Sequence, residues 1–321
     1  MRKILTSFIF IIAIASGLGV GYGAVHTSGA IFKVATAYVA EVTTDLNFAQ
    51  AEEGGPGAEV AEPEAQKKPE GTFYITNQNK KPKISAHSYL AADLETGKIL
   101  IAKNITNQMP IASVTKLMTA LVADEVVGLD AKTVVNATAI NTYGTQGDLK
   151  KGETYTVSEL FYPLLLESSN DAAEALAMAK DRPSFIADMN GKARSIGMID
   201  TEFDDASGLS YDNKSTAVDL LKMTRYIMSY RGYIFDITTN KEMKLGKKTW
   251  FSNSKFRSDE EYVGGKNGFT DEALKTQVAL FEQDFNGEKR TIVYIILRSN
   301  DIAYDINMLR DYVYKSVQYE K

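Results

Sequence analysis

The pattern of hydrophobic and polar positions divides the 321-residue chain into parts of different character. Residues 4–32 contain no Asp, Glu, Lys or Arg, whereas residues 49–83 are rich in Glu, Pro, Gly and Lys. Short apolar runs typical of strands come next, followed by residues 131–231, where apolar positions recur at helical spacing. Strand-length apolar runs return near the end, and Asn286-Gly287 between two of them indicates a hairpin.

This order of elements predicts an α+β fold. Residues 86–104 predict two strands around a turn at Thr96-Gly97, and the late strands can join them in one antiparallel sheet flanked by helices. Residues from about 131 to 231 then form an inserted helical subdomain, and a C-terminal helix is expected at about 304–317. A functional site is expected where the sheet meets the helical part.

The N-terminal part of the chain is predicted to lie outside the folded domain. Residues 1–32 begin with Met-Arg-Lys and continue as an apolar stretch, which predicts an export signal or, as we favour, a membrane anchor. Residues 33–83 are predicted to be a low-complexity tether, because such a composition cannot bury enough apolar surface to fold alone. Residues 84–321 are predicted to form the folded domain, outside the cytoplasm.

Cysteine and histidine are scarce in this chain, which narrows the available chemistry. The absence of cysteine excludes thiol nucleophiles and disulfides, and the only histidines are His26 and His87. A histidine-rich metal site is therefore excluded, and a Ser-His-Asp mechanism would have to use His87. The net charge of -5, without a basic stripe, argues against a nucleic-acid partner. Lysine is the natural candidate for a catalytic base.

The stretch Ala112–Ala120 places a lysine in an otherwise apolar helix. An unpaired ammonium buried in such a helix is costly and tends to lose its proton. Ser113 lies three residues before Lys116 on the same helical face, and a hydroxyl beside a lysine of lowered pKa is an activated nucleophile. Ser252 and Lys255 repeat this spacing, but in a polar segment where the lysine can be solvated.

Two further motifs contain candidate polar residues. Ser168 and Asn170 lie between two predicted helices, where the alternative interpretation is a helix stop followed by an Asp171 cap. Lys266 and Gly268 lie on a predicted strand, where a lysine can also protect a sheet edge and a glycine can allow a bend. For an isolated motif these alternatives are favoured. Along the chain, however, S-x-x-K, S-x-N and K-x-G occur together and in that order.

This set resembles the motifs of penicillin-binding proteins and serine β-lactamases. From about residue 84 to about residue 315 the chain resembles the low-molecular-weight D-alanyl-D-alanine carboxypeptidases. The segments that carry the resemblance, in family order, are PIASVTKLMTA, LLLESSNDAAEALA, MNGKARSIGM, TEFDDASGLSYDNKSTAVDL and GGKNGFTDEA. The resemblance implies a β-lactamase/transpeptidase-like fold and a serine D,D-carboxypeptidase that removes the terminal D-alanine from peptidoglycan stem peptides. No metal or organic cofactor is expected.

The resemblance also implies a role for each motif residue. Ser113 would attack the substrate carbonyl and form an acyl-enzyme, and Lys116 would take the serine proton. Ser168 would relay a proton to the leaving D-alanine. Asn170 would hold Lys116 and the substrate amide, and Lys266 would supply positive potential.

The strand that contains Lys266 is implied to bind the substrate. The candidate substrate-binding residues are Asn267, Gly268, Phe269 and Thr270. The backbone N–H groups of Ser113 and Phe269 would form the oxyanion hole. Asn267 replaces the threonine of the family's K-T-G motif, whose hydroxyl binds the substrate carboxylate. For the arginine that the family usually carries after the last strand, Arg298 is the candidate.

Several related functions remain open. A D,D-endopeptidase or a β-lactamase would share the acyl-serine step, and a catalytically weak protein could keep the fold and bind peptidoglycan or penicillin. The expected partners are stem peptides ending in D-Ala-D-Ala, β-lactams as inhibitors, and the membrane through the N-terminus. The expected location is the cell envelope, outside the cytoplasmic membrane.

Overall fold

A computed structural model describes residues 71–76, 81–144 and 147–320 of the chain. The predicted anchor of residues 1–32 lies outside the described residues, as does most of the predicted tether. Within the described part of the chain, no helix is both long enough and apolar enough to span a membrane.

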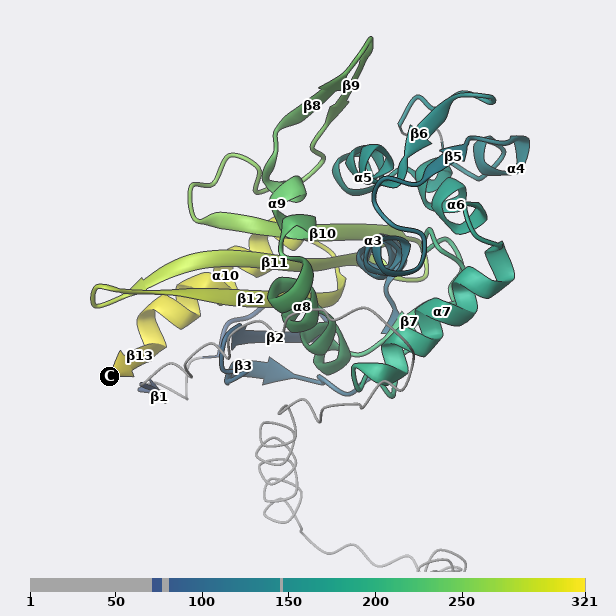
Figure 1. The fold of residues 1–321 in the computed structure, drawn as a ribbon. Coiled ribbons are helices and arrows are strands. Elements are labelled where there is room, and N and C mark those ends of the chain that lie inside the picture. The colour runs from purple at the N-terminus through teal and green to yellow at the C-terminus, as the bar shows by residue number, and fades with distance from the viewer. Residues whose placement is uncertain (1–70, 77–80, 145–146, 321) are drawn as a thin grey trace, which may run out of the picture. The chain divides into compact units, whose positions relative to one another are not determined.

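A five-stranded antiparallel sheet lies at the centre of the described chain, with the strand order β10-β11-β12-β2-β3 (Figure 1). The strands are β2 (Ser88–Asp93), β3 (Ile99–Lys103), β10 (Tyr262–Thr270), β11 (Leu274–Phe285) and β12 (Glu288–Ser299). The early strands pair with the late strands through β2 and β12. The predicted single antiparallel sheet is therefore confirmed.

The predicted hairpin joins β11 and β12. Asn286 and Gly287 both have positive φ, at 58° and 90°, as the two-residue turn that matches strand twist requires. The Gly287 N–H donates to a carboxylate oxygen of Asp284 at 2.6 Å. This local turn sets the register of the two longest strands.

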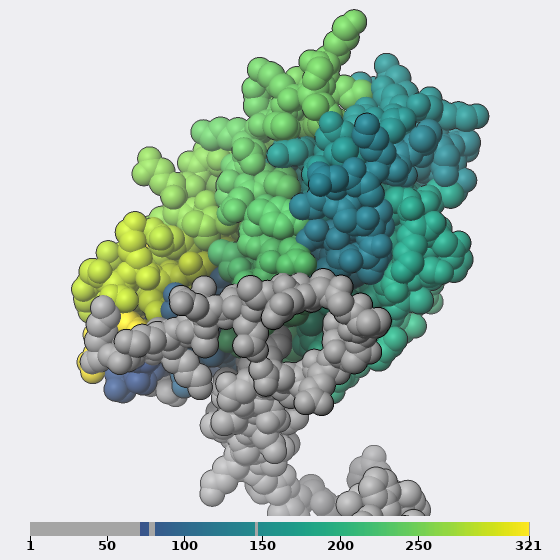
Figure 2. Space-filling view, viewed as in Figure 1, coloured from purple at the N-terminus to yellow at the C-terminus, as the bar shows by residue number. Residues whose placement is uncertain are grey.

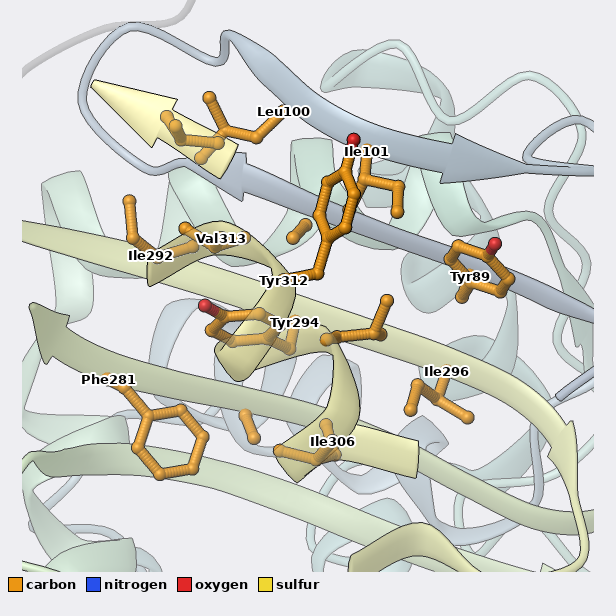
Figure 3. Close-up of a cluster of buried hydrophobic side chains, with 14 of the residues drawn as sticks. Tyr89, Leu100, Ile101, Phe281, Ile292, Tyr294, Ile296, Ile306, Tyr312 and Val313 are labelled. Atoms are coloured by element: carbon orange, nitrogen blue, oxygen red, sulfur yellow. The ribbon is translucent and has the colours of Figure 1, made fainter. Parts of the chain in front are cut away.

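Helices cover both faces of the sheet. The helix α10 (Ile302–Ser316) packs on β11 and β12, and α8 (Ala217–Arg231) packs on β12 and β2 from the opposite side (Figure 1). Alternate residues of β12 enter the apolar cluster beneath α10, namely Ile292, Tyr294 and Ile296 (Figure 3). The residues between them are buried as well. Burial on both faces explains why this strand is an almost continuous apolar run.

The lysine-bearing helix α3 (Thr115–Val126) packs against the helices of the middle part of the chain. Those helices are α4 (Ala137–Ile140), α5 (Val157–Leu166), α6 (Asn170–Met178) and α7 (Arg182–Ser195), accompanied by the strand pair β5 (Lys132–Val134) and β6 (Thr154–Thr156). Every residue of α3 from Thr115 to Ala123 is buried, as its apolar pattern predicts.

Short elements connect these two parts. The helix α9 (Tyr233–Thr239) contacts β10, and β4 (Met109–Pro110) pairs with β7 (Lys214–Ser215). The hairpin of β8 (Glu242–Leu245) and β9 (Lys248–Phe251) projects from the rest of the domain in both views (Figure 1 and Figure 2).

One strand pair is absent from the sequence-based expectations. The strand β1 (Thr72–Ile75), which lies within the segment predicted as tether, pairs antiparallel with β13 (Val317–Glu320). Phe73 of β1 packs edge-on against Phe285 at the end of β11, with ring centroids 5.4 Å apart. The folded part therefore includes residues before the predicted boundary at residue 84.

Candidate active site

Ser113 lies in η1 (Ala112–Val114), a single 3₁₀ turn that leads directly into α3. Ala112 has φ 46°, a left-handed conformation that residues other than glycine rarely adopt. The turn therefore holds the serine in a strained backbone at the N-terminal end of a helix. The positive end of the helix dipole favours negative charge at this point.

Neighbouring residues fix this turn from two sides. A hydrogen bond of 2.9 Å from the Thr276 hydroxyl to the Ile111 carbonyl holds the chain that enters the turn. A Cβ atom on Gly208 would lie 2.0 Å from the carbonyl oxygen that precedes Ser113, and one on Gly268 would lie 2.7 Å from the Ser113 nitrogen. Glycine is required at both positions, because any side chain would displace the turn.

Lys116 lies in the first turn of α3 and is completely buried. Its Nζ atom donates to Ser113 Oγ at 2.9 Å, to Asn170 Oδ1 at 2.7 Å and to the carbonyl oxygen of Ser207. All three acceptors are neutral groups. The predicted contact between the serine and the lysine is present, and Asn170 joins it.

The surroundings of Lys116 favour its neutral form. Burial, and next the positive charge of Lys266, hold the pKa of Lys116 well below its ordinary value, although Asp205 and Glu174 act in the opposite direction. Burial also lowers the pKa of Lys266, to about 7. An amine with a lowered pKa is deprotonated over more of the physiological pH range and can accept a proton. Once Nζ has lost a proton, it can accept a hydrogen bond from the Ser113 hydroxyl in place of donating to it, so the arrangement suits Lys116 as a base for this serine.

Asn170 begins α6 and connects Lys116 with a second part of the chain. Its side-chain amide donates to the carbonyl oxygen of Tyr143 at 2.7 Å while its oxygen accepts from Lys116. The helix cap is Ser169, which accepts from a backbone N–H in the first turn of the helix, and not Asp171. The side chain of Asn170 is therefore not used as a helix cap and bonds to Lys116 and Tyr143 instead.

Ser168 lies in the turn between α5 and α6. It is half-buried and has φ 65°, so the chain turns sharply there. Its side chain makes no hydrogen bond with another described residue. In the structure, therefore, no hydrogen bond joins Ser168 to Ser113 or Lys116.

The candidate substrate-binding residues lie at the C-terminal end of β10, which is an edge strand of the sheet. Lys266 is buried and donates to the carbonyl oxygen of its neighbour Asn267 at 2.8 Å. Asn267 is half-buried and Phe269 is 60% exposed. The Thr270 hydroxyl accepts from the Ala273 N–H at 3.1 Å and so holds the turn into β11. The outer edge of this strand borders the turn that carries the serine.

The chain matches the family model for D-alanyl-D-alanine carboxypeptidases, peptidase family S11, over residues 75–296. This protein belongs to that family. The family recognised from the motifs is therefore confirmed.

Individual S11 relatives differ in name and length. The chain is 30% identical over 210 residues to D-alanyl-D-alanine carboxypeptidase DacF of Bacillus subtilis, covering 59% of this chain and 52% of the relative. It is 38% identical over 149 residues to a D-alanyl-D-alanine endopeptidase of Haemophilus influenzae, covering 45% and 51%. The chain thus spans about half the length of these two curated relatives.

A solved structure has a similar fold. Penicillin-binding protein D2 from Listeria monocytogenes, determined in a cefotaxime-bound form, matches with a TM-score of 0.62 and 27% identity. The match covers 73% of this chain and 98% of that chain. The predicted α+β, penicillin-binding fold is confirmed.

Two other residues singled out from the sequence, Ser252 and Arg298, do not bond to Ser113, Lys116 or Asn170. Ser252, from the second S-x-x-K, follows β9 and accepts a hydrogen bond from the backbone N–H of Ser254 at 3.3 Å, while Lys255 is exposed. Arg298 donates to the carbonyl oxygen of Glu272 at 2.9 Å, in the turn between β10 and β11. Arg298 therefore stabilises the turn that follows the candidate substrate-binding strand.

Residues of one further loop, which the sequence motifs did not indicate, complete the site. Ser207 accepts from Lys116, Gly208 lies against the turn before Ser113, and Asp205 binds the backbone of the same loop. The segment TEFDDASGLS was noted only for its family resemblance. The available signal was an acidic residue followed closely by Ser-Gly, because a carboxylate can accept several N–H groups of a tight loop.

Proposed function

We propose that this protein is a serine D,D-carboxypeptidase that removes the terminal D-alanine from peptidoglycan stem peptides. The observation that carries the proposal is the completely buried Lys116, in hydrogen-bond contact with both Ser113 Oγ and Asn170 Oδ1. A buried amine of lowered pKa beside a hydroxyl is suited to nucleophilic catalysis without histidine. Membership of the S11 family supports the choice of substrate.

The proposed acylation step uses Ser113 and Lys116. Ser113 Oγ attacks the carbonyl carbon between the two D-alanines while its proton passes to the neutral Nζ of Lys116. The C–N bond then breaks, and the leaving nitrogen of D-alanine takes a proton, which we assign to a relay through Ser168. Water then attacks the acyl-serine ester, releases the shortened peptide and restores the hydroxyl.

The proposed binding groups lie along β10. The protonated Lys266 supplies positive potential, and the Asn267 amide donates to the terminal carboxylate of the substrate. The N–H groups of Ser113 and Phe269 stabilise the oxyanion. The close approach of Gly268 to the Ser113 nitrogen supports this assignment, because it places the strand and the turn side by side.

The proposed location is the outer side of the cytoplasmic membrane. Residues 1–32 would anchor the chain, and residues 33–70, the part of the predicted 33–83 tether that precedes β1, would connect the anchor to the domain, as their composition indicates. Membranes washed with alkaline carbonate should retain the full chain and lose a chain that begins at residue 71. A full-length protein recovered in the wash would contradict the anchor.

A D,D-endopeptidase is the second candidate function. Asn267 favours it, because this residue replaces the threonine that binds a free carboxylate in the family, and an amide side chain can also bond to the amide of a cross-link. The endopeptidase name of one relative points the same way. Both candidates share the acylation step.

Two assays test these proposals. A fluorescent penicillin should label Ser113, and the label should be lost in Ser113→Ala but kept in the matched variant Ser252→Ala. Labelling that survives Ser113→Ala would contradict the assignment of the nucleophile. Free D-alanine released from a peptide ending in D-Ala-D-Ala supports the carboxypeptidase, whereas cleavage of cross-linked muropeptide dimers alone supports the endopeptidase.

A further inference from the structure

The loop of residues 205–213, hereafter the Asp205 loop, is organised around one carboxylate. Asp205 is 7% exposed, and its Oδ1 accepts from the Ser207 N–H at 2.7 Å and hydroxyl at 3.1 Å, from the Gly208 N–H at 2.5 Å and from the Asn213 amide at 3.1 Å. Its Oδ2 accepts from the Ser210 N–H at 2.6 Å. All five donors are neutral, so the negative charge is solvated by the loop itself.

The residues that follow Asp205 contact α3 and the turn before it. The carbonyl of Ala206 accepts from the Thr119 hydroxyl at 2.6 Å, and the carbonyl of Ser207 accepts from Lys116. Gly208 lies against the backbone that precedes Ser113. Three consecutive residues of the loop therefore position the candidate base and nucleophile.

The charges around Lys116 come from three other elements. Lys266 faces it from β10, Glu174 from α6 and Asp205 from its loop. Glu174 is paired with Arg182 at 2.7 Å, whereas the hydrogen bonds to Asp205 come from neutral groups. Although burial opposes ionisation, these backbone hydrogen bonds hold the pKa of Asp205 below its ordinary value. Asp205 therefore remains a negative charge near Lys116.

We propose that Asp205 is a positioning residue for the acyl-serine step: its carboxylate shapes the loop so that the Ser207 carbonyl holds Lys116, and its negative charge lies close enough to favour the ammonium form of this lysine. The inference rests on the proposed function, because it assigns Asp205 to the same reaction. It does not require Asp205 to contact the substrate.

The test is the pH dependence of the rate of labelling by a fluorescent penicillin. Asp205→Asn removes a negative charge that favours the ammonium form, so the pKa of Lys116 falls further. The midpoint of the rise in rate with pH should move down by about one unit. The maximal rate should also fall. The NH₂ group of the asparagine cannot accept a hydrogen bond from a backbone N–H of the loop, so the loop should shift. The matched control is Asp204→Asn, an exposed neighbour, which should leave midpoint and rate unchanged.

The outcomes separate positioning from simple structural support. If Asp205→Asn lowers the rate but leaves the midpoint in place, or changes neither, the inference is overturned. If this variant does not fold, Asp205→Glu provides the test, because the longer side chain keeps the charge but displaces the loop. It should lower the rate about tenfold or more with an unchanged midpoint. An unchanged rate, or a shifted midpoint, overturns the inference.

Failure of the proposed function gives a different result. A wild-type protein that takes no label overturns the acyl-serine chemistry, and this inference with it. If the wild type is labelled but Asp205→Asn leaves the pH midpoint of the labelling rate unchanged, only this inference is overturned.

Discussion

Two buried basic side chains in this protein, Arg290 in the sheet and Lys116 at the candidate site, have opposite surroundings. Arg290 is 3% exposed and donates to both oxygens of Asp93, at 3.1 and 2.9 Å, and to Glu95 at 2.7 Å. Lys116 is fully buried and donates only to neutral oxygens at Ser113, Asn170 and Ser207. A buried cation in contact with carboxylates keeps its proton, whereas one among neutral acceptors loses it more readily.

The backbone differs between the same two regions. The cluster beneath α10 consists of regular strands and a helix, with apolar side chains such as Phe281 and Ile306 packed together (Figure 3). At the candidate site, Ala112 and Ser168 have left-handed φ, at 46° and 65°, and two glycines admit close backbone contacts. Strained conformations of this kind persist only where the surrounding structure holds them, and they concentrate at functional sites.

The largest expected effect is the loss of the base. Lys116→Arg places in the pocket a cation that cannot lose its proton, because a guanidinium stays protonated in proteins. The rate of labelling by a fluorescent penicillin should fall about a thousandfold. A rate within about tenfold of the wild type, in a variant with an unchanged melting temperature, would show that another group serves as base.

The next largest effect concerns the paired cation. Arg290→Met leaves the fully buried carboxylate of Asp93 without its partner and should lower the free energy of unfolding by about 3 kcal/mol. Urea unfolding measures this change. Labelling at temperatures where the variant is folded should keep the wild-type pH profile. The matched control is Lys289→Met, which breaks an exposed ion pair with Glu282 and should leave the unfolding midpoint unchanged.

A smaller effect is expected from the glycine that supports the strained turn. The Cβ of Gly208→Ala would collide with the backbone before Ser113 and displace the nucleophile, so acylation should slow about a hundredfold. Gly246→Ala is the control, because Gly246 also has positive φ, at 57°, but a Cβ added there would meet no atom within 4 Å. Equal labelling rates in the two variants would mean that the turn tolerates displacement.

The smallest effect separates the two lysines of the site by pH. Lys266 has a pKa of about 7, so its positive charge is present below that pH and is lost as the pH rises through it. The KM for a peptide ending in a free D-alanine carboxylate should therefore rise roughly fivefold from a pH well below this pKa to a pH well above it. The C-terminal amide of the same peptide should show a flat KM. A flat KM for both peptides would remove Lys266 from carboxylate binding.

Local sequence spacing explains which contacts could be predicted. Ser113 and Lys116 are three residues apart, in a 3₁₀ turn that continues into α3, so local helical geometry alone brings them together. Asn170 and Lys266 lie far away in sequence, and only the resemblance to a family placed them in the same site. The catalytic roles of these residues, and of Ser168, stay predictions.

Other features depend on geometry that sequence patterns do not express. The N–H groups that bind Asp205 point to one carboxylate only because the loop takes a particular backbone path, with φ 85° at Gly208. The strand β1 has four residues next to a polar segment, too short for a periodic signal, and its partner β13 lies at the other end of the described chain. Pairing over such a separation requires the fold to be known first.

The two-stranded sheet of β1 and β13 lies at the end of the central sheet that is farther from Ser113. Phe73 of β1 packs on Phe285 at one end of β11, whereas Thr276, near the other end, bonds to the chain just before Ser113. Phe285 and Thr276 are separated by about 30 Å of strand at the usual rise per residue. The strand β1 and the candidate nucleophile therefore lie near opposite ends of β11.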